Sequence, residues 1–174
     1  CVDPNYAVEK TENYNGKQIN FVKAIEKSSN KLILMMDVLE HVADDVALLK
    51  YYADSMEAGG YIFITVPAFQ FMWSGHDIFL EHHRRYTIKT IETVATKAGM
   101  TPIKSRYFFA SLVPAIALLR LVKKIILNRG GLKPMSDLKL YPEWLNSILI
   151  TLHDIERHTL FDFNKGFGLS VCCL

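Results

Sequence analysis

The sequence predicts an α/β fold in which a mostly parallel sheet is flanked by helices, with a helical insert before the last strand. An apolar run, a helical pattern and a second apolar run follow one another between residues 31 and 66, which is the order of a βαβ unit. Strand and helix patterns then alternate along much of the chain, as is typical of a parallel α/β sheet. The 174 residues, 50% of them hydrophobic, suffice for one domain with a buried core.

The parts of the βαβ unit have distinct patterns. Residues 31–36 (KLILMM) are a short apolar run, which predicts a strand buried on both faces. Over 40–58 apolar residues recur every three or four positions, and two glycines at 59–60 then end the pattern as a helix C-cap does. Residues 61–66 (YIFITV) predict a second buried strand, and Pro67 ends it.

The remaining elements continue the alternation. A loop over 69–86, rich in aromatic residues and histidine, precedes a helix that Thr87 can cap and Gly99 can end. Further strands are predicted, in chain order, at 1–2, 19–24, 100–108 and 168–174. The strand at 19–24 follows a polar turn at 14–17, which has the composition of a reverse turn.

Two helical segments form an insert or lid over 108–163, within a single predicted domain of residues 1–174. The first segment, 108–127, is strongly apolar but contains Pro114, Arg120 and two lysines, which argues against a membrane span. It is either a core-packed helix or an amphipathic surface that contacts a bilayer or a lipid-like substrate. The second segment, 141–163, has apolar residues at helical spacing and is expected to pack on the core or on a partner.

Composition and charge restrict the class of partner and the compartment. The formal net charge of +2, from 20 basic and 18 acidic residues, gives no concentrated excess of cations, so we expect no nucleic-acid partner. The 3 cysteines match neither a disulfide framework nor a metal-binding spacing, and a reducing, cytoplasmic location is expected. The chain begins at Cys1 without a secretory signal pattern, which we interpret as a truncated beginning.

Polar residues follow two of the predicted strands, those at 1–2 and 31–36. In open parallel sheets ligands bind beyond the carboxyl ends of the strands, so Asp3, Asp37, Glu40 and His41 are expected to face one crevice. Asp3 can accept hydrogen bonds from ribose hydroxyls, or it belongs to an ordinary Asp-Pro turn. Glu40 can serve as an acid at a helix N-terminus. That role does not explain His41, which can act as a general base.

The loop at 76–86 contains the densest polar cluster in the chain. Its members could hold an anionic acceptor, since arginine makes bidentate contacts to carboxylate or phosphate. The alternative is a solvated loop held by arginine salt bridges. The candidate substrate-binding residues are His76, His82, His83, Arg84, Arg85 and Tyr86.

Residues 34–42 (LMMDVLEHV), followed by 59–67 (GGYIFITVP), resemble the fourth strand, the motif after it and the fifth strand of class I S-adenosylmethionine-dependent methyltransferases. Trp73, the pair His76–Asp77 and residues 82–87 (HHRRYT) resemble one small-molecule branch of that superfamily. The resemblance covers residues 1 to about 108 and resumes at 167–171. It implies a Rossmann-like sheet.

The resemblance also implies a cofactor and roles for particular residues. S-adenosylmethionine would be the methyl donor, with Asp3 on its ribose and with Met36 and Asp37 near its methionine portion. His41 would face the acceptor, a small or lipid-linked molecule, as a candidate base. The glycine-rich turn that binds the cofactor in this family is absent from the sequence, and no acid matches the family's adenine contact.

Two alternatives remain open. The set Asp37, Glu40 and His41 resembles the acid, acid and histidine ligands of some metal-dependent quinone-type O-methyltransferases, and carboxylate and imidazole are suitable metal ligands. Our main hypothesis is a site without a metal ion. A different class of function is a non-catalytic binding module that retains the methyltransferase fold without cofactor turnover, which the missing glycine turn would explain.

Overall fold

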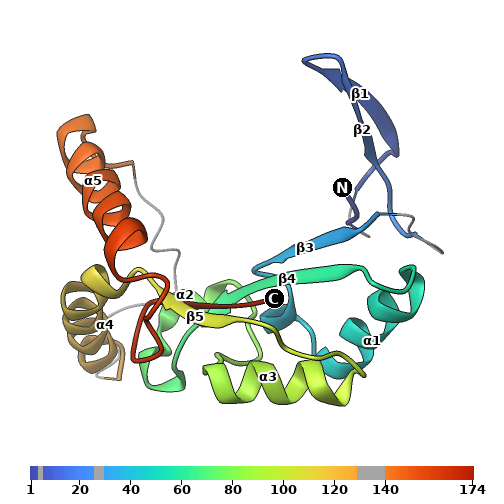
Figure 1. Ribbon diagram of the computed structural model, residues 1–174. Coiled ribbons are helices and arrows are strands. Elements are labelled where there is room, and N and C mark those ends of the chain that lie inside the picture. Colours follow the sequence, from blue (N-terminus) through green and yellow to red (C-terminus); the bar gives the residue numbers. More distant parts are fainter. Residues whose placement is uncertain (4–5, 26–29, 129–139) are drawn as a thin grey trace.

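The computed structural model describes residues 1–3, 6–25, 30–128 and 140–174, with the side chains of 123–128 left out (Figure 1). The strands are β1 (Lys10–Tyr14), β2 (Lys17–Phe21), β3 (Leu32–Met36), β4 (Tyr61–Pro67), β5 (Ser105–Phe108) and β6 (Ser170–Cys173). The α-helices are α1 (Asp45–Ser55), α2 (Gly75–Phe79), α3 (Ile88–Lys97), α4 (Val113–Asn128) and α5 (Glu143–Thr159). Three short 3-10 turns are η1 (Leu39–His41), η2 (Gln70–Met72) and η3 (Ala110–Leu112). The chain is therefore of the mixed α/β class, as predicted.

The main sheet has 4 strands in the order β3-β4-β6-β5. β3 and β4 pair in parallel, as expected for the βαβ unit, whereas β6 lies between β4 and β5 and runs antiparallel to both. The expectation of a mostly parallel set of pairings therefore does not hold for the described residues. The position of the insert explains why β6 runs antiparallel to β5. The chain leaves the sheet after Phe108 and returns beside it, since the Leu169 N–H donates to the Phe108 carbonyl (3.0 Å).

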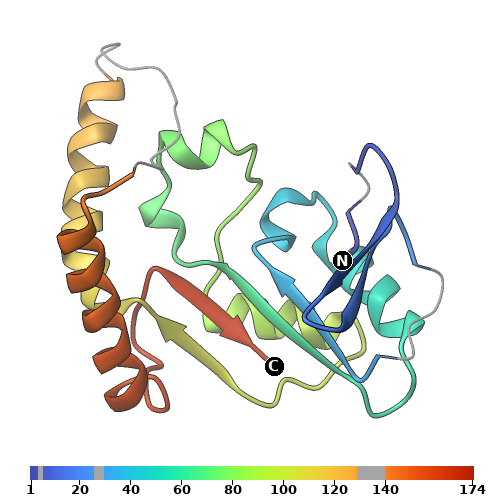
Figure 2. The ribbon, with the colours of Figure 1, turned by 90° about the horizontal axis from the view of Figure 1, so that it is seen from above.

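Only one face of this sheet is covered by the described helices. α1 and α3 lie together on that face (Figure 1), over a core that includes Met35, Leu49, Ile64 and Ile91. Figure 2 looks onto the other face, and no described helix lies in front of the strands.

The uncovered face corrects our prediction that the strand at 31–36 is buried on both faces. Leu32, Leu34 and Met36 are exposed, whereas Met35 is buried between them. The side chains of a strand alternate between the two faces of a sheet, and the described helices cover only the side of Met35. An apolar run alone cannot distinguish a strand covered on both faces from one covered on a single face.

The N-terminal segment forms a separate antiparallel hairpin of β1 and β2. Its turn is Asn15–Gly16, where both residues have positive φ (49° and 76°), as a tight hairpin turn requires. The predicted strand at the chain start is reduced to an isolated parallel bridge between Val2 and Val22. In Figure 1 the hairpin rises away from the main sheet.

The described residues of the predicted insert contain η3, α4 and α5. Pro114 occupies the first turn of α4, where a missing N–H costs no helical hydrogen bond. The buried carboxylate of Glu156 on α5 accepts hydrogen bonds from the backbone N–H groups of Ala110 (2.7 Å) and Ser111 (3.0 Å), which ties α5 to η3. Within the described part of the chain, no helix combines the length and apolar character needed to cross a membrane.

Candidate functional site

The motif after β3 forms a tight turn at the end of the sheet. The Asp37 N–H donates to the Thr65 carbonyl of β4 (2.9 Å), and Asp37 has a φ of 52°, which turns the chain out of the strand. The 3-10 turn η1 follows, and α1 begins later than predicted. Asp44 caps α1 by accepting from the Ala47 N–H (2.9 Å). Since Asp44 caps α1, helix capping does not explain Glu40.

Glu40 is a buried acid with an incomplete set of partners. Glu40 is only 1% exposed, and its Oε2 atom has no hydrogen-bond partner among the described residues. Burial raises the pKa of Glu40 to about 8, and the carboxylates of Asp37 and Asp77 add to this rise while the Arg85 guanidinium opposes it. At neutral pH this carboxyl is therefore mostly protonated. Burial also raises the pKa of Asp37.

Asp77 organises the loop that faces Glu40. It belongs to a capping box at the start of α2, where its Oδ2 accepts from the backbone N–H of Ser74 (2.8 Å). Its Oδ1 accepts from Arg85 Nε (2.7 Å) and lies 3.1 Å from His82 Nδ1. Burial alone would raise the pKa of Asp77, but the Arg85 guanidinium and the other donors outweigh it and lower the pKa. Asp77 is therefore an ionised carboxylate inside the protein.

The side chains of His41 and His82 contact each other and lie close to Glu40. Their rings contact edge to face, with centroids 4.6 Å apart and planes at 87°. The His82 side chain is 7% exposed, and His41 is exposed. Burial lowers the pKa of His82; the Asp77 hydrogen bond acts against that shift, and His41 adds to it. One donor atom from each of Glu40, His41 and His82 lies within 4.8 Å of the other two.

A pocket of about 230 Å³ opens at this point. It brings together six predicted or considered site residues, namely Asp37, Glu40, His41, His76, His82 and Arg85. The sequence analysis did not select Arg120 of α4 or Ser170 of β6, which also line the pocket. No local pattern marks them, because the insert brings them here through the fold.

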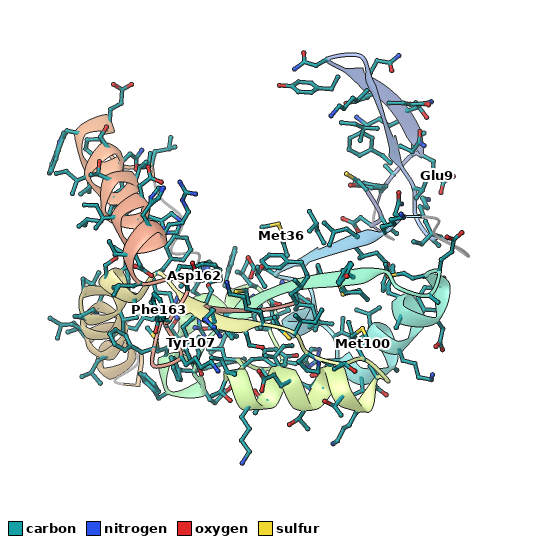
Figure 3. All side chains as sticks on the ribbon, viewed as in Figure 1. Glu9, Met36, Met100, Tyr107, Asp162 and Phe163 are labelled. Carbon is teal, nitrogen blue, oxygen red and sulfur yellow. The ribbon has the colours of Figure 1, made fainter. Side chains whose placement is uncertain are left out.

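Five other predicted site residues do not line this pocket: Asp3, Met36, His83, Arg84 and Tyr86. Asp3 lies beside the hairpin, where its N–H donates to the Val22 carbonyl (3.0 Å). Met36 points away from the helices on the uncovered face of the sheet (Figure 3), and it is 60% exposed.

The other three hold the loop against the turn after β3. The His83 N–H donates to the Glu40 carbonyl (2.6 Å). Arg84 Nη1 and the buried Tyr86 hydroxyl both donate to Asp45 Oδ2, at 3.0 and 2.8 Å. Asp45 was not predicted: the sequence analysis placed the helical pattern over 40–58, and only the structure puts Asp45 in the first turn of α1. These contacts position the pocket, and a role in substrate binding stays a prediction.

Comparisons with known proteins give a limited result. No protein-family model and no curated protein matches the chain. Among solved structures, a crystal structure of a SAM dependent methyltransferase from Archaeoglobus fulgidus is similar with a TM-score of 0.46 and 16% sequence identity. The match covers 91% of this chain and 67% of that one.

Proposed function

We propose that the protein transfers a methyl group from S-adenosylmethionine to a small or lipid-linked acceptor, with His41 as the base. The proposal rests on the pocket at the end of β3, where an exposed imidazole stands beside two acids. It also rests on the motif resemblance at 34–42 and 59–67 described above. The cofactor would supply an electrophilic methyl group on a positively charged sulfonium.

The described residues fit a cationic donor in part. Asp37 lines the pocket and can place a carboxylate near a sulfonium. Asp3, the expected ribose acid, is not among the lining residues, so its role rests on the resemblance alone.

His41 is the best candidate for moving a proton. A hydroxyl or amine acceptor loses a proton as it attacks the methyl carbon, and an imidazole nitrogen can accept it. A well-placed base contributes about 10²–10⁴ in rate. His82 is less suitable, since its Nδ1 already faces Asp77 and its pKa is lowered.

Calorimetry on the full-length protein with S-adenosylmethionine and its demethylated product tests the proposal. We expect saturable binding, and Asp37→Asn should weaken it about tenfold or more, since hydrogen bonds to charged groups are worth about 1.5–3 kcal/mol. Asp54→Asn is the matched control, because Asp54 forms an exposed pair with Lys50 on α1. Absence of binding at millimolar ligand would overturn the proposal and favour the non-catalytic binding module.

We also propose that the first part of the insert, 108–127, contacts membrane lipid. Leu118, Leu119, Leu121 and Val122 of α4 are 62%, 57%, 56% and 47% exposed, which favours the amphipathic-surface reading over a core-packed helix for these residues. In the sequence they are followed by two lysines at 123–124, which suits an anionic lipid surface.

Flotation with anionic liposomes tests this contact. Replacing Leu118 and Leu121 by serine should reduce the floated fraction, since less apolar area is available for burial in the lipid. The matched control replaces Leu32 by serine. Leu32 is 51% exposed on β3 and lies far along the chain from the insert. Equal flotation of the wild type and the double variant would refute the lipid contact.

A further inference from the structure

Three metal-type donors from two separate segments converge at the pocket. Glu40 and His41 belong to η1, and His82 follows α2, 41 residues after His41 in the sequence. The short hydrogen bond from the His83 N–H to the Glu40 carbonyl (2.6 Å) holds the two segments together. The metal set considered from the sequence was Asp37, Glu40 and His41; the geometry replaces Asp37 with His82.

The orientation of His82 suits a metal ligand. Asp77 is a fully buried carboxylate that pairs with the Arg85 guanidinium (2.7 Å) and lies 3.1 Å from His82 Nδ1, so Nδ1 carries the hydrogen and donates it to Asp77. The lone pair is then on Nε2, on the other side of the ring. A carboxylate that fixes the tautomer and orientation of an imidazole is the usual outer partner of a metal-binding histidine.

The burial of Glu40 is a second observation, separate from the donor cluster, that points to a bound ligand. Glu40 is 1% exposed, and its Oε2 has no hydrogen-bond partner among the described residues. A buried polar atom without a partner costs about 1–3 kcal/mol, and more when it is charged. A cation between Glu40 and the two imidazoles would remove this cost.

The local charges permit a cation. Asp37 also lines the pocket, and the guanidinium of Arg85 is neutralised by Asp77 at 2.7 Å. Arg120 lines the pocket as an opposing positive charge, and its Nη1 donates to the Met72 carbonyl (2.9 Å). Binding of a cation would release the Glu40 proton, and the carboxylates of Asp37 and Glu40 would then outnumber the charge of Arg120.

The spacing requires one adjustment. Zinc bonds of about 2.0–2.2 Å in a tetrahedral site separate ligand atoms by roughly 3.3–3.6 Å. The three donor atoms lie within 4.8 Å of one another, so they must close by a side-chain rotation. Glu40 and His82 are held by burial, whereas His41 is exposed and can rotate.

We propose that Glu40, His41 and His82 bind a divalent transition-metal ion of the zinc class, with Asp77 as the residue that positions His82. Two imidazoles and one carboxylate select zinc or cobalt over magnesium, which prefers oxygen ligands. Three protein ligands would leave a coordination position open toward the pocket. This inference does not depend on methyl transfer. It competes with the role of His41 as the base, because an imidazole with one nitrogen bound to a metal carries a hydrogen on the other and cannot accept a proton.

Titration of the metal-stripped full-length protein with Co²⁺ and Zn²⁺ near neutral pH tests the site without cofactor or acceptor. Calorimetry should show one ion per chain, and Co²⁺ should produce the visible absorption of a low-symmetry site. Mg²⁺ should not compete. Asp77→Asn should lower the affinity about 10- to 100-fold, as loss of an outer partner does, and His82→Gln should lower it further.

Two variants keep the test independent of folding. His41→Asn changes an exposed side chain and should weaken binding while the circular dichroism spectrum is unchanged. His158→Asn changes an exposed histidine on α5 and should leave binding as in the wild type. No binding below millimolar Zn²⁺, or the same affinity in wild type and His82→Gln, would overturn the proposal. Loss of the metal in His158→Asn alone would also overturn it, because it would locate the ion at a surface histidine.

Discussion

Replacing Asp77 with asparagine should destabilise the protein strongly. The residue is fully buried at 0% exposure, and its carboxylate accepts from Ser74, His82 and Arg85. Asparagine has nearly the same shape, so the change removes the charge and one acceptor without leaving a cavity. The largest effect is on Arg85, whose side chain is 3% exposed and would lose the negative charge that pairs with its guanidinium.

The magnitude follows from the partner left behind. Breaking a buried ion pair by removing one member costs about 3–5 kcal/mol, because the other charge is left uncompensated. The amide oxygen of asparagine can still accept one hydrogen bond, and Arg85 keeps its bond to the Ala68 carbonyl (3.0 Å). We therefore expect a loss near the lower limit, about 3 kcal/mol.

Urea denaturation followed by circular dichroism measures this loss. Asp54→Asn is the control, since its salt bridge to Lys50 joins side chains that are 65% and 58% exposed, and such pairs contribute about 0–1 kcal/mol. A loss below about 1 kcal/mol for Asp77→Asn would refute the buried-pair reasoning.

The pH dependence gives a second test of the same residue. The pKa of Asp77 is lowered in the folded protein from its ordinary value of 3.8. The group therefore contributes stability that is fully present above pH 3.8 and is lost as the pH falls through the folded-state pKa. The difference between wild type and Asp77→Asn should therefore decrease as the pH falls below 3.8. An unchanged difference at low pH would contradict the assignment.

Three further substitutions test how the surrounding structure is held. Glu156→Gln should cost about 1.5–3 kcal/mol at pH 7, because the buried carboxylate accepts from Ala110 and Ser111. The pKa of Glu156 is lowered from 4.5 although burial opposes the shift. The loss of stability relative to wild type should therefore diminish as the pH falls below 4.5. The control Glu143→Gln changes an exposed residue of α5 and should change stability little. Tyr86→Phe should cost about 1.5–3 kcal/mol in urea denaturation, since its hydroxyl donates to the Asp45 carboxylate at 2.8 Å, and a loss under 0.5 kcal/mol would contradict that role. Gly168→Ala should lower the melting temperature, because the added Cβ would lie 2.4 Å from the Phe108 carbonyl oxygen, whereas Gly166→Ala meets no atom closer than 3.8 Å and should not.

The sequence by itself determined the elements whose information is local. The helix at α3 follows from a Thr87 cap and a glycine at 99, which has a φ of 86°. The strands β3 and β4 follow from apolar runs ended by Asp37 and Pro67, and their parallel pairing follows from the helix between them. Local propensity and periodicity are written in neighbouring residues, so they can be read without the fold.

Only the tertiary structure decided what distant segments do to one another. It placed β6 between β4 and β5, since the insert returns the chain at the end of the sheet where β5 stops. It left Leu34 and Met36 exposed, because the described helices cover one face of the sheet.

The candidate site divides in the same way. The sequence selected His41 and His82 as polar residues in separate segments. The fold brought them into ring contact at 4.6 Å and placed both beside the buried Glu40. It also used Arg84 and Tyr86 as internal supports for Asp45. Which donors meet, and which are consumed by internal hydrogen bonds, depends on packing between segments, and no local pattern encodes that.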